Sequence, residues 1–263
     1  MKIIGYSERG AMNALFYGMA FKEDENAMKE FLKLAGISDV DNYSNFELYM
    51  EFSLSDFGDP DLVIKANKGG KSVVIFVEAK VSDCSSYSLN KAFKTHVDNI
   101  GKQEFVDGEA SNLFFQLRLK NRLFKTIKEI PKSEEKYERN VKKTNEEFDK
   151  IAMTRIQGND VYRSIGNNPV VRRFVDEIRN CQSALYIAII PENDEIEENK
   201  EEYNKVEEEL GGIYFVTWQE FFDNSILNKY VKETIAFNQG PDPQTVSKKL
   251  KNQILNTPIT KMK

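Results

Sequence analysis

The sequence contains few of the residues that bind transition metals or provide a general base, since it has one histidine and two cysteines. A hydrolase with a histidine base would depend on His96 alone, and His96 has no cysteine or acidic residue at metal-ligand spacing beside it. Cys84 and Cys181 also lack metal-binding spacing, and two distant cysteines in a chain without a predicted secretion signal are expected to be free thiols. These shortages disfavour zinc sites, histidine-based hydrolases and disulfide-stabilised secreted domains.

Long apolar segments are missing as well. The longest apolar runs, "VVIFV" and "ALYIAII", are too short to span a bilayer. The N-terminal stretch "MKIIGYSERG" has neither the apolar region nor the small-residue cleavage site of a signal peptide. We therefore expect a cytoplasmic protein without a membrane partner. A homo-oligomer is compatible with the sequence, which gives no argument for one.

The charge is unevenly distributed along the chain. The net charge is −5, but residues 192–209 alone carry −8, so the remainder sums to +3 (−5 minus −8). Two stretches are basic: the helical region that contains Arg118 and Arg122, and the tail of residues 243–263, which has five lysines and no acid. Charge runs are most often solvated faces, and the overall charge neither requires nor excludes a nucleic-acid partner.

The hydrophobic pattern predicts an α/β fold with a mixed sheet and helices on both of its faces. We expect a single domain over residues 1–242, with a helical insertion at about 121–182, and a basic tail over 243–263. The expected helices cover residues 7–21, 23–35 and much of 86–182, then 195–210 and the segment after Thr217; the expected strands cover 46–54, 61–66, 72–81, 184–191 and 213–217. The first three strands are joined by short connections and should form an antiparallel meander.

The segment "GDPDLVIKANKGGKSVVIFVEAKV" places charged residues at the ends of two strongly apolar strands. In the second of these strands Val74, Phe76, Glu78 and Lys80 share one face, and the other face is apolar throughout. Both faces begin apolar, as in a strand that is covered on both sides. Because burying a charge is costly unless it is paired or binds a metal, Glu78 and Lys80 call for a specific explanation.

The turn between these strands predicts which residues lie opposite each other. If the two glycines of "NKGGK" form a two-residue turn, Leu62 faces Val77 and Asp61 faces Glu78. Side chains that are directly opposed have Cβ atoms about 5 Å apart. Two carboxylates at that distance repel each other unless a cation lies between them, and Mg²⁺ takes oxygen ligands at about 2.1 Å. The hairpin therefore predicts a metal site at Asp61 and Glu78.

Lys80 lies two residues beyond Glu78 on the same face, where an ammonium can orient an attacking water or stabilise charge that develops on a phosphate. An ordinary structural explanation also exists. Glu-x-Lys is common on exposed strands, Pro-Asp is a common turn dipeptide, and the charges could form a structural ion cluster. The order of the motifs, their shared face and their core-like surroundings favour the metal site.

Pro60-Asp61 followed by Glu78-Ala79-Lys80 resembles the signature of the PD-(D/E)XK nuclease superfamily, whose members have a restriction-endonuclease-like fold. The resemblance covers the first helix, the meander and the strands near Ala184 and Ile213, and it leaves the helical stretch from about 121 to 182 unexplained. It implies a core of one helix, three antiparallel strands, a helix and further strands.

By this resemblance Asp61 and Glu78 would bind Mg²⁺ or Mn²⁺, the Ala79 carbonyl would be a further ligand, and Lys80 would be the catalytic lysine. Many family members add an acid from the first helix, for which Glu8 is the candidate; alternatively, Glu8 only complements the helix dipole. Family members also often carry a glutamine on a later helix. Gln116 is the candidate for that residue, or it is an ordinary, partly buried glutamine.

The sequence is compatible with two functions from different classes. The first is a Mg²⁺- or Mn²⁺-dependent nuclease, with DNA as the expected substrate and RNA as an alternative that the sequence leaves open. The second is a non-catalytic nucleic-acid-binding or regulatory protein on the same fold. The intact Asp61, Glu78 and Lys80 favour the first. In it the basic stretch from Arg118 to Lys128, which includes Arg122, the lysine-rich tail of residues 243–263, or both would help to hold the nucleic-acid backbone.

Overall fold

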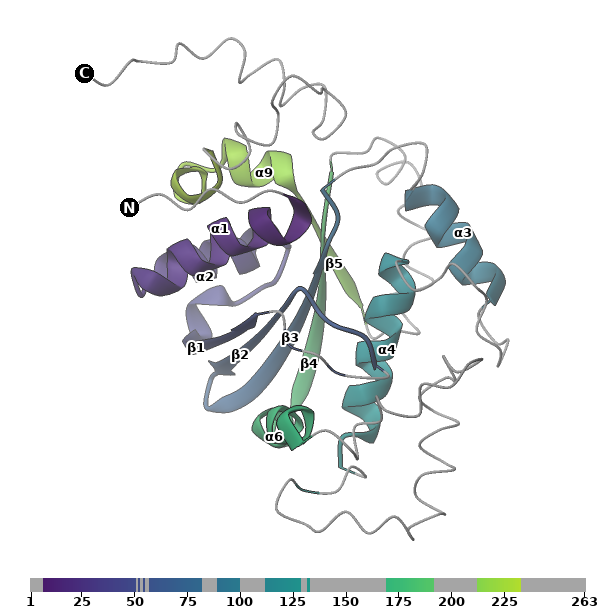
Figure 1. Ribbon diagram of the computed structural model, residues 1–263. Coiled ribbons are helices and arrows are strands. Elements are labelled where there is room, and N and C mark those ends of the chain that lie inside the picture. Colours follow the sequence, from purple (N-terminus) through teal and green to yellow (C-terminus); the bar gives the residue numbers. More distant parts are fainter. Residues whose placement is uncertain are drawn as a thin grey trace, which may run out of the picture.

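The computed structural model describes residues 7–50, 52, 54, 57–81, 89–99, 112–128, 132, 169–191 and 212–232. These residues form a mixed sheet flanked by helices (Figure 1). The helices are α1 (Ser7–Phe21), α2 (Glu25–Leu34), a short 3-10 helix (Val40–Asn42), α3 (Leu89–Asn99), α4 (Leu113–Thr126), α6 (Pro169–Ile178) and α9 (Trp218–Asp223). The strands are β1 (Tyr43–Met50), β2 (Leu62–Lys68), β3 (Lys71–Ala79), β4 (Ser183–Ile190) and β5 (Ile213–Thr217).

The sheet has five strands in the order β1-β2-β3-β4-β5. Strands β1, β2 and β3 are antiparallel neighbours, whereas β4 pairs parallel with β3 and β5 pairs parallel with β4. The predicted mixed sheet and antiparallel meander are confirmed. Strand β1 begins at Tyr43, three residues before the predicted start, because it follows β2 as far as Lys68, which is paired with Tyr43.

The β2–β3 hairpin has the predicted register. Gly69 and Gly70 both have positive φ angles, +56° and +83°, which a two-residue turn of this kind requires and which glycine adopts without steric cost. Lys68 is paired with Lys71 across the turn, and Leu62 is paired with Val77. The end of β3 therefore lies beside the residue that precedes β2, which is Asp61.

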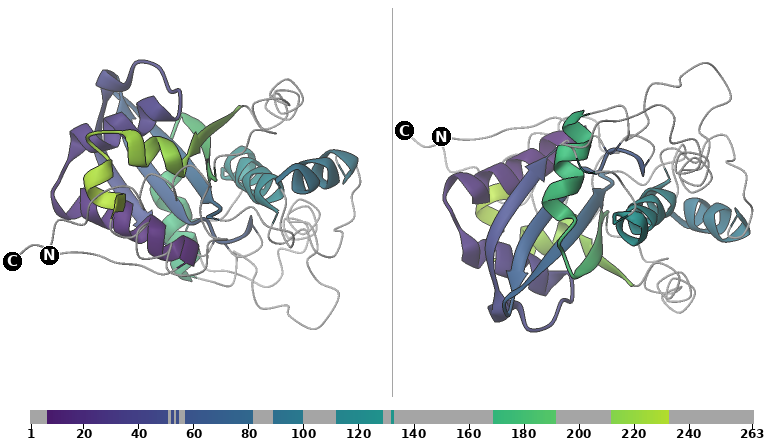
Figure 2. Two further views of the ribbon diagram at one scale, coloured as in Figure 1. Left: turned by 90° about the horizontal axis from the view of Figure 1, so that it is seen from above. Right: turned by 90° about the horizontal axis from the view of Figure 1, so that it is seen from below.

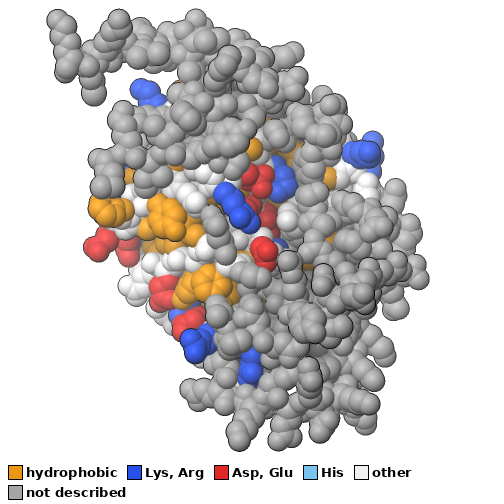
Figure 3. All heavy atoms as spheres, in the orientation of Figure 1, with side chains coloured by type: hydrophobic (Ala, Val, Ile, Leu, Met, Phe, Trp, Pro, Cys, Tyr) orange, Lys and Arg blue, Asp and Glu red, His pale blue; other side chains and the backbone are white. Residues whose placement is uncertain are grey.

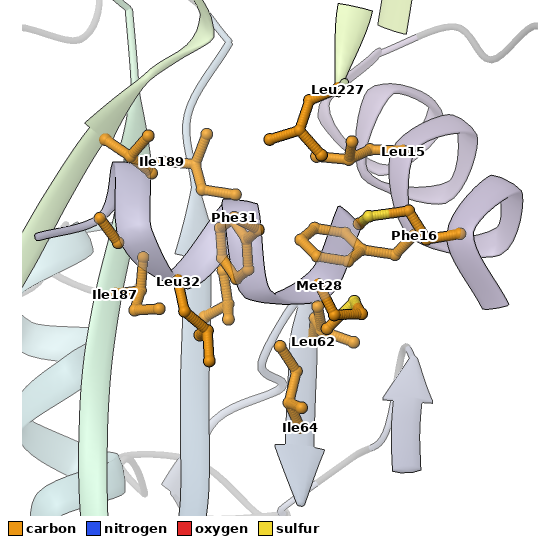
Figure 4. Close-up of a cluster of buried hydrophobic side chains, with 14 of the residues drawn as sticks. Leu15, Phe16, Met28, Phe31, Leu32, Leu62, Ile64, Ile187, Ile189 and Leu227 are labelled. Carbon is orange, nitrogen blue, oxygen red and sulfur yellow. The ribbon is translucent and has the colours of Figure 1, made fainter. Parts of the chain in front are cut away.

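Helices cover both faces of the sheet, as predicted (Figure 2). One face of β3 carries Val73, Ile75, Val77 and Ala79, which pack in a hydrophobic cluster with side chains of α1, α2 and α9. Figure 4 shows part of this cluster, in which Phe16 and Phe31 lie between the helices and the sheet. The other face packs against α3, α4 and α6 in a second cluster. Because β3 is central and covered on both sides, both of its faces are apolar up to Glu78.

A capping box is present at the start of α9. The Thr217 hydroxyl accepts a hydrogen bond from the Glu220 backbone N–H, and the Glu220 carboxylate accepts one from the Thr217 backbone N–H. This cap fixes the turn from β5 into α9 and so the position of Trp218. In the described part of the chain, no helix is long and apolar enough to cross a membrane.

Three predicted features lie wholly or largely outside the described residues. They are most of the helical insertion, the acidic segment of residues 192–209 and the basic tail of residues 243–263. Helix α4 runs through residue 121, where the insertion was expected to begin, so the chain has no element boundary there.

Candidate active site

Four of the predicted site residues meet where β3 ends. Asp61 directly precedes β2, Glu78 is the penultimate residue of β3, and Lys80 follows that strand. Glu8 comes from the first turn of α1. The antiparallel pairing of β2 and β3 brings Asp61 to Glu78, and the packing of α1 against the sheet adds Glu8.

Asp61 lies at the point where the β2–β3 ladder stops. One of its carboxylate oxygens, Oδ2, accepts a hydrogen bond from the backbone N–H of Ala79 at 2.8 Å. The carboxylate thus accepts a hydrogen bond from a backbone N–H of β3 that lies beyond the last residue pair of the β2–β3 ladder. Burial raises the pKa of Asp61, and this effect is opposed by the Lys80 charge and by the Ala79 hydrogen bond.

Glu78 is fully buried and forms an ion pair with a residue that the sequence did not place in the site. Its Oε1 atom lies 2.7 Å from the Nζ atom of Lys120 on α4, and both side chains are inaccessible to solvent. Burial raises the pKa of Glu78 to about 7; the Lys120 charge opposes the rise and the nearby Asp61 charge adds to it. Glu78 is therefore a strongly desolvated carboxylate whose charge depends on its neighbours.

Lys80 connects the other components of the site. Its Nζ atom donates hydrogen bonds to Oε1 of Glu8 at 3.1 Å and to the Ala79 carbonyl at 2.8 Å. Its backbone is held on both sides, because its N–H donates to the Ile189 carbonyl at 2.8 Å and its C=O accepts from Nε1 of Trp218 at 2.9 Å. These hydrogen bonds fix the backbone of Lys80, and so the origin of its side chain, at the end of the sheet.

Glu8 points toward the sheet. Sequence reasoning left open whether Glu8 faces the sheet or only complements the dipole of its helix, and its ion pair with Lys80 places it at the sheet. Burial raises the pKa of Glu8, Lys80 lowers it, and Asp61 raises it further. The Glu8 side chain is 28% exposed and that of Lys80 is 13% exposed, so solvent reaches this side of the cluster. Figure 3 shows acidic and basic side chains side by side around the N-terminal end of α1.

The donor atoms of the site suit a hard divalent cation, since the carboxylates of Asp61 and Glu78 and the Ala79 carbonyl all offer oxygen. Among the residues that the structure describes, no group of three or more His, Cys, Asp or Glu side chains is arranged to hold a metal ion. Two of the predicted ligands bind ammonium groups instead: Lys120 pairs with Glu78, and Lys80 donates to the Ala79 carbonyl. The chemistry of the donors fits Mg²⁺. In this structure two of the three predicted ligands, Glu78 and the Ala79 carbonyl, contact lysine ammonium groups.

Helix α4 supplies the other predicted residues. Gln116 precedes Lys120 by one helical turn, is half-buried, and its Oε1 atom has no hydrogen-bond partner among the described residues. Arg118 and Arg122 are also half-buried, and their charges act on His96 of α3. They lie two residues from Lys120, about 200° around the helix, and so face away from Glu78.

Lys120 corrects one expectation from the sequence. It belongs to the basic stretch that was predicted to contact nucleic acid, yet it is completely buried and cannot reach a phosphate backbone. The helical spacing of apolar residues could have predicted that Lys120 is buried. Lys120 lies in an apolar stripe along α4 and its C-terminal end, and the other members of this stripe are fully or almost fully buried. They are Leu113, Leu117, Leu123 and Ile127.

No model of a known protein family matches the chain, and neither a curated protein nor a solved structure is significantly similar to it. Any assignment of function therefore depends on the chemistry of the site.

Proposed function

We propose that the protein is a Mg²⁺- or Mn²⁺-dependent nuclease that hydrolyses phosphodiester bonds, with DNA as the expected substrate. One observation carries the proposal. Two carboxylates, Asp61 and Glu78, converge at the end of β3 with Lys80, whose side chain is partly exposed. Burial raises the pKa of each carboxylate, and desolvated acidic residues that lie together with a partly exposed lysine make this end of the sheet a candidate functional site.

The order of the elements supports the same proposal. Helices α1 and α2 precede three antiparallel strands, helices on the opposite face follow, and the next strand pairs parallel with β3. We take this order as compatible with a restriction-endonuclease-like core, in which the end of β3 carries the site.

In this proposal Asp61, Glu78 and the Ala79 carbonyl hold the divalent cation. When bound, such a cation polarises a phosphodiester and lowers the pKa of water, so that a nucleophile is available at neutral pH. Lys80 orients the attacking water and stabilises the charge that develops on phosphorus, and the backbone contacts of Lys80 with Ile189 and Trp218 keep it in place. Glu8 holds the Lys80 ammonium through their 3.1 Å ion pair.

A screen for cleavage tests this function. Labelled linear, circular and single-stranded DNA, and RNA, are each incubated with the protein in Mg²⁺, Mn²⁺ or EDTA, beside the Asp61→Asn variant. We expect cleavage of at least one substrate that requires the metal and is abolished by Asp61→Asn, because the variant lacks a negative ligand. Cleavage that is equal in EDTA or equal in the variant would reject the proposal.

The buried ion pair favours a second candidate function. Glu78 is neutralised by Lys120 inside the protein, as a retained structural pair would be in a non-catalytic nucleic-acid-binding or regulatory protein. The two functions differ in their response to metal. A structural pair leaves the melting temperature unchanged by Mg²⁺, whereas a metal site makes the melting temperature rise as the Mg²⁺ concentration exceeds the dissociation constant.

A further inference from the structure

Lys120 has an unusual environment for a lysine. Its side chain has 0% exposure, it comes from the middle of α4, and its Nζ atom lies 2.7 Å from Oε1 of Glu78. Fully buried lysines are rare unless they are paired. Glu78 is the one acidic side chain among the described residues that forms an ion pair with this ammonium, so the two charges depend on each other.

The loop that carries Asp61 packs against the same ammonium. A Cβ atom added at Gly58 would lie 3.0 Å from Nζ of Lys120, and Gly58 has a φ of +75°. Glycine at this position therefore permits both the backbone conformation and the close approach of the loop to Lys120. Lys120 thus contacts β3 through Glu78 and also lies beside the loop that leads to Asp61.

The cluster contains as many basic side chains as acidic ones. Its acids are Glu8, Asp61 and Glu78, and its bases are Arg9, Lys80 and Lys120, each of which acts on at least one of those acids. A divalent cation would add two positive charges beside two ammonium groups that already hold proposed ligand oxygens. Lys120 opposes the added charge persistently, since it is buried, cannot move into solvent without repacking α4, and already holds a ligand oxygen.

We propose that Lys120 is the internal counter-ion of the site and competes with the divalent cation for Glu78. The inference rests on the proposed function, because it takes Glu78 as a metal ligand. Lys120 is then a positioning residue that holds the carboxylate in place when no metal is bound, and it sets the metal concentration at which the site is loaded. A neutral side chain at position 120 makes loading easier at the cost of stability in the metal-free protein.

The test compares Lys120→Met with the wild type and with Lys125→Met, a variant that removes the same charge from an exposed position of the same helix. Methionine is close to lysine in length and keeps the apolar contacts that the lysine side chain makes. The binding of Mn²⁺ to each protein is measured without nucleic acid, by the loss of the electron paramagnetic resonance signal of free Mn²⁺. We expect Lys120→Met to bind Mn²⁺ at least about tenfold more tightly than the wild type, because a positive charge next to the ligand has been removed. Lys125→Met should bind like the wild type.

Mn²⁺ affinity in Lys120→Met that equals or falls below that of the wild type overturns the inference. If Lys120→Met is unfolded without metal, its melting is measured with Mn²⁺ and beside the double variant Glu78→Gln/Lys120→Met. Recovery of folding by Mn²⁺ in the single variant supports the inference, since the cation then replaces the ammonium. Failure of Mn²⁺ to restore the single variant overturns it, and the double variant, which leaves neither charge unpaired, then shows whether the fold accepts an uncharged position 120.

Cleavage by the wild type separates the two claims. A wild type that cleaves nucleic acid with Mn²⁺ while Lys120→Met gains no affinity refutes the role of Lys120 alone. A wild type that neither cleaves nor binds Mn²⁺, beside a Lys120→Met variant that binds Mn²⁺, supports the role of Lys120 and refutes the nuclease.

Discussion

At the scale of single residues, His96 links the stability of the protein to pH. Its ring is buried and stacks with Phe114 at a centroid distance of 6.1 Å, and its Nε2 atom has no hydrogen-bond partner among the described residues. Burial, together with the charges of Arg118 and Arg122, lowers the pKa of His96 to about 4. The fold therefore holds His96 in its neutral form.

The sign of the effect follows from the direction of the shift. The pKa in the folded state lies below the ordinary value of 6.5, so stability is complete above pH 6.5 and is lost as the pH falls from 6.5 toward 4. Between pH 7.5 and 4.5 this contribution amounts to about 2–3 kcal/mol. When the pH falls from 7.5 to 4.5, the free energy of unfolding of His96→Phe should decrease by about 2–3 kcal/mol less than that of the wild type. Urea denaturation at both pH values measures this difference. The same pH dependence in both proteins would show that the ring is accessible to protons in the folded state.

At the scale of elements, α4 has two different sides. One side is buried against the sheet and carries Lys120, and the other carries the half-buried Arg118 and Arg122. If the protein binds nucleic acid, the arginine side is the part of α4 that can contact phosphates. The helix would then hold the ligand carboxylate with one side and the substrate backbone with the other.

Reversing both arginine charges tests this division. Arg118→Glu/Arg122→Glu should weaken nucleic-acid binding and reduce the dependence of affinity on salt, because fewer counterions are released on binding. Fluorescence anisotropy with labelled DNA at several salt concentrations measures both effects. The matched control is Lys33→Glu/Lys71→Glu, which reverses two exposed charges on α2 and at the hairpin turn. An equal loss of affinity in test and control variants would assign the effect to overall charge.

The elements also show what the sequence could predict. Alternation and the double glycine predicted the β2–β3 register, because a two-residue turn leaves a single pairing that keeps both apolar faces in the core. The proximity of Asp61 and Glu78 followed from that register and the place of Lys80 from strand alternation, whereas Glu8 was a candidate by the family resemblance. The partner of Glu78 was missed. Its identity depends on how α4 is rotated and placed over β3, which local patterns do not determine.

At the scale of the whole molecule, the fold brings together parts of the chain that are far apart in sequence. The site combines the start of α1, the ends of a central hairpin, the middle of α4 and the turn from β5 into α9. The end of β3 lies beside the end of β4, where the ladder continues through the hydrogen bond from Lys80 to Ile189. The site is therefore built on the central strands of the sheet and completed by helices from both faces.

The most direct test of the proposed nuclease is the single-turnover rate of metal-dependent cleavage by the wild type and by Lys80→Met, on whichever labelled nucleic acid the wild type cleaves. Lys80 lies at the partly exposed side of the cluster and its replacement leaves both carboxylates in place, so the variant should fold and retain Mn²⁺ binding. We expect a rate lower by a factor of about 100–1,000, because one preorganised charge has been lost at the reacting phosphate. An unchanged rate in Lys80→Met, or no cleavage of any DNA or RNA by the wild type in Mg²⁺ or Mn²⁺, would contradict the proposed function.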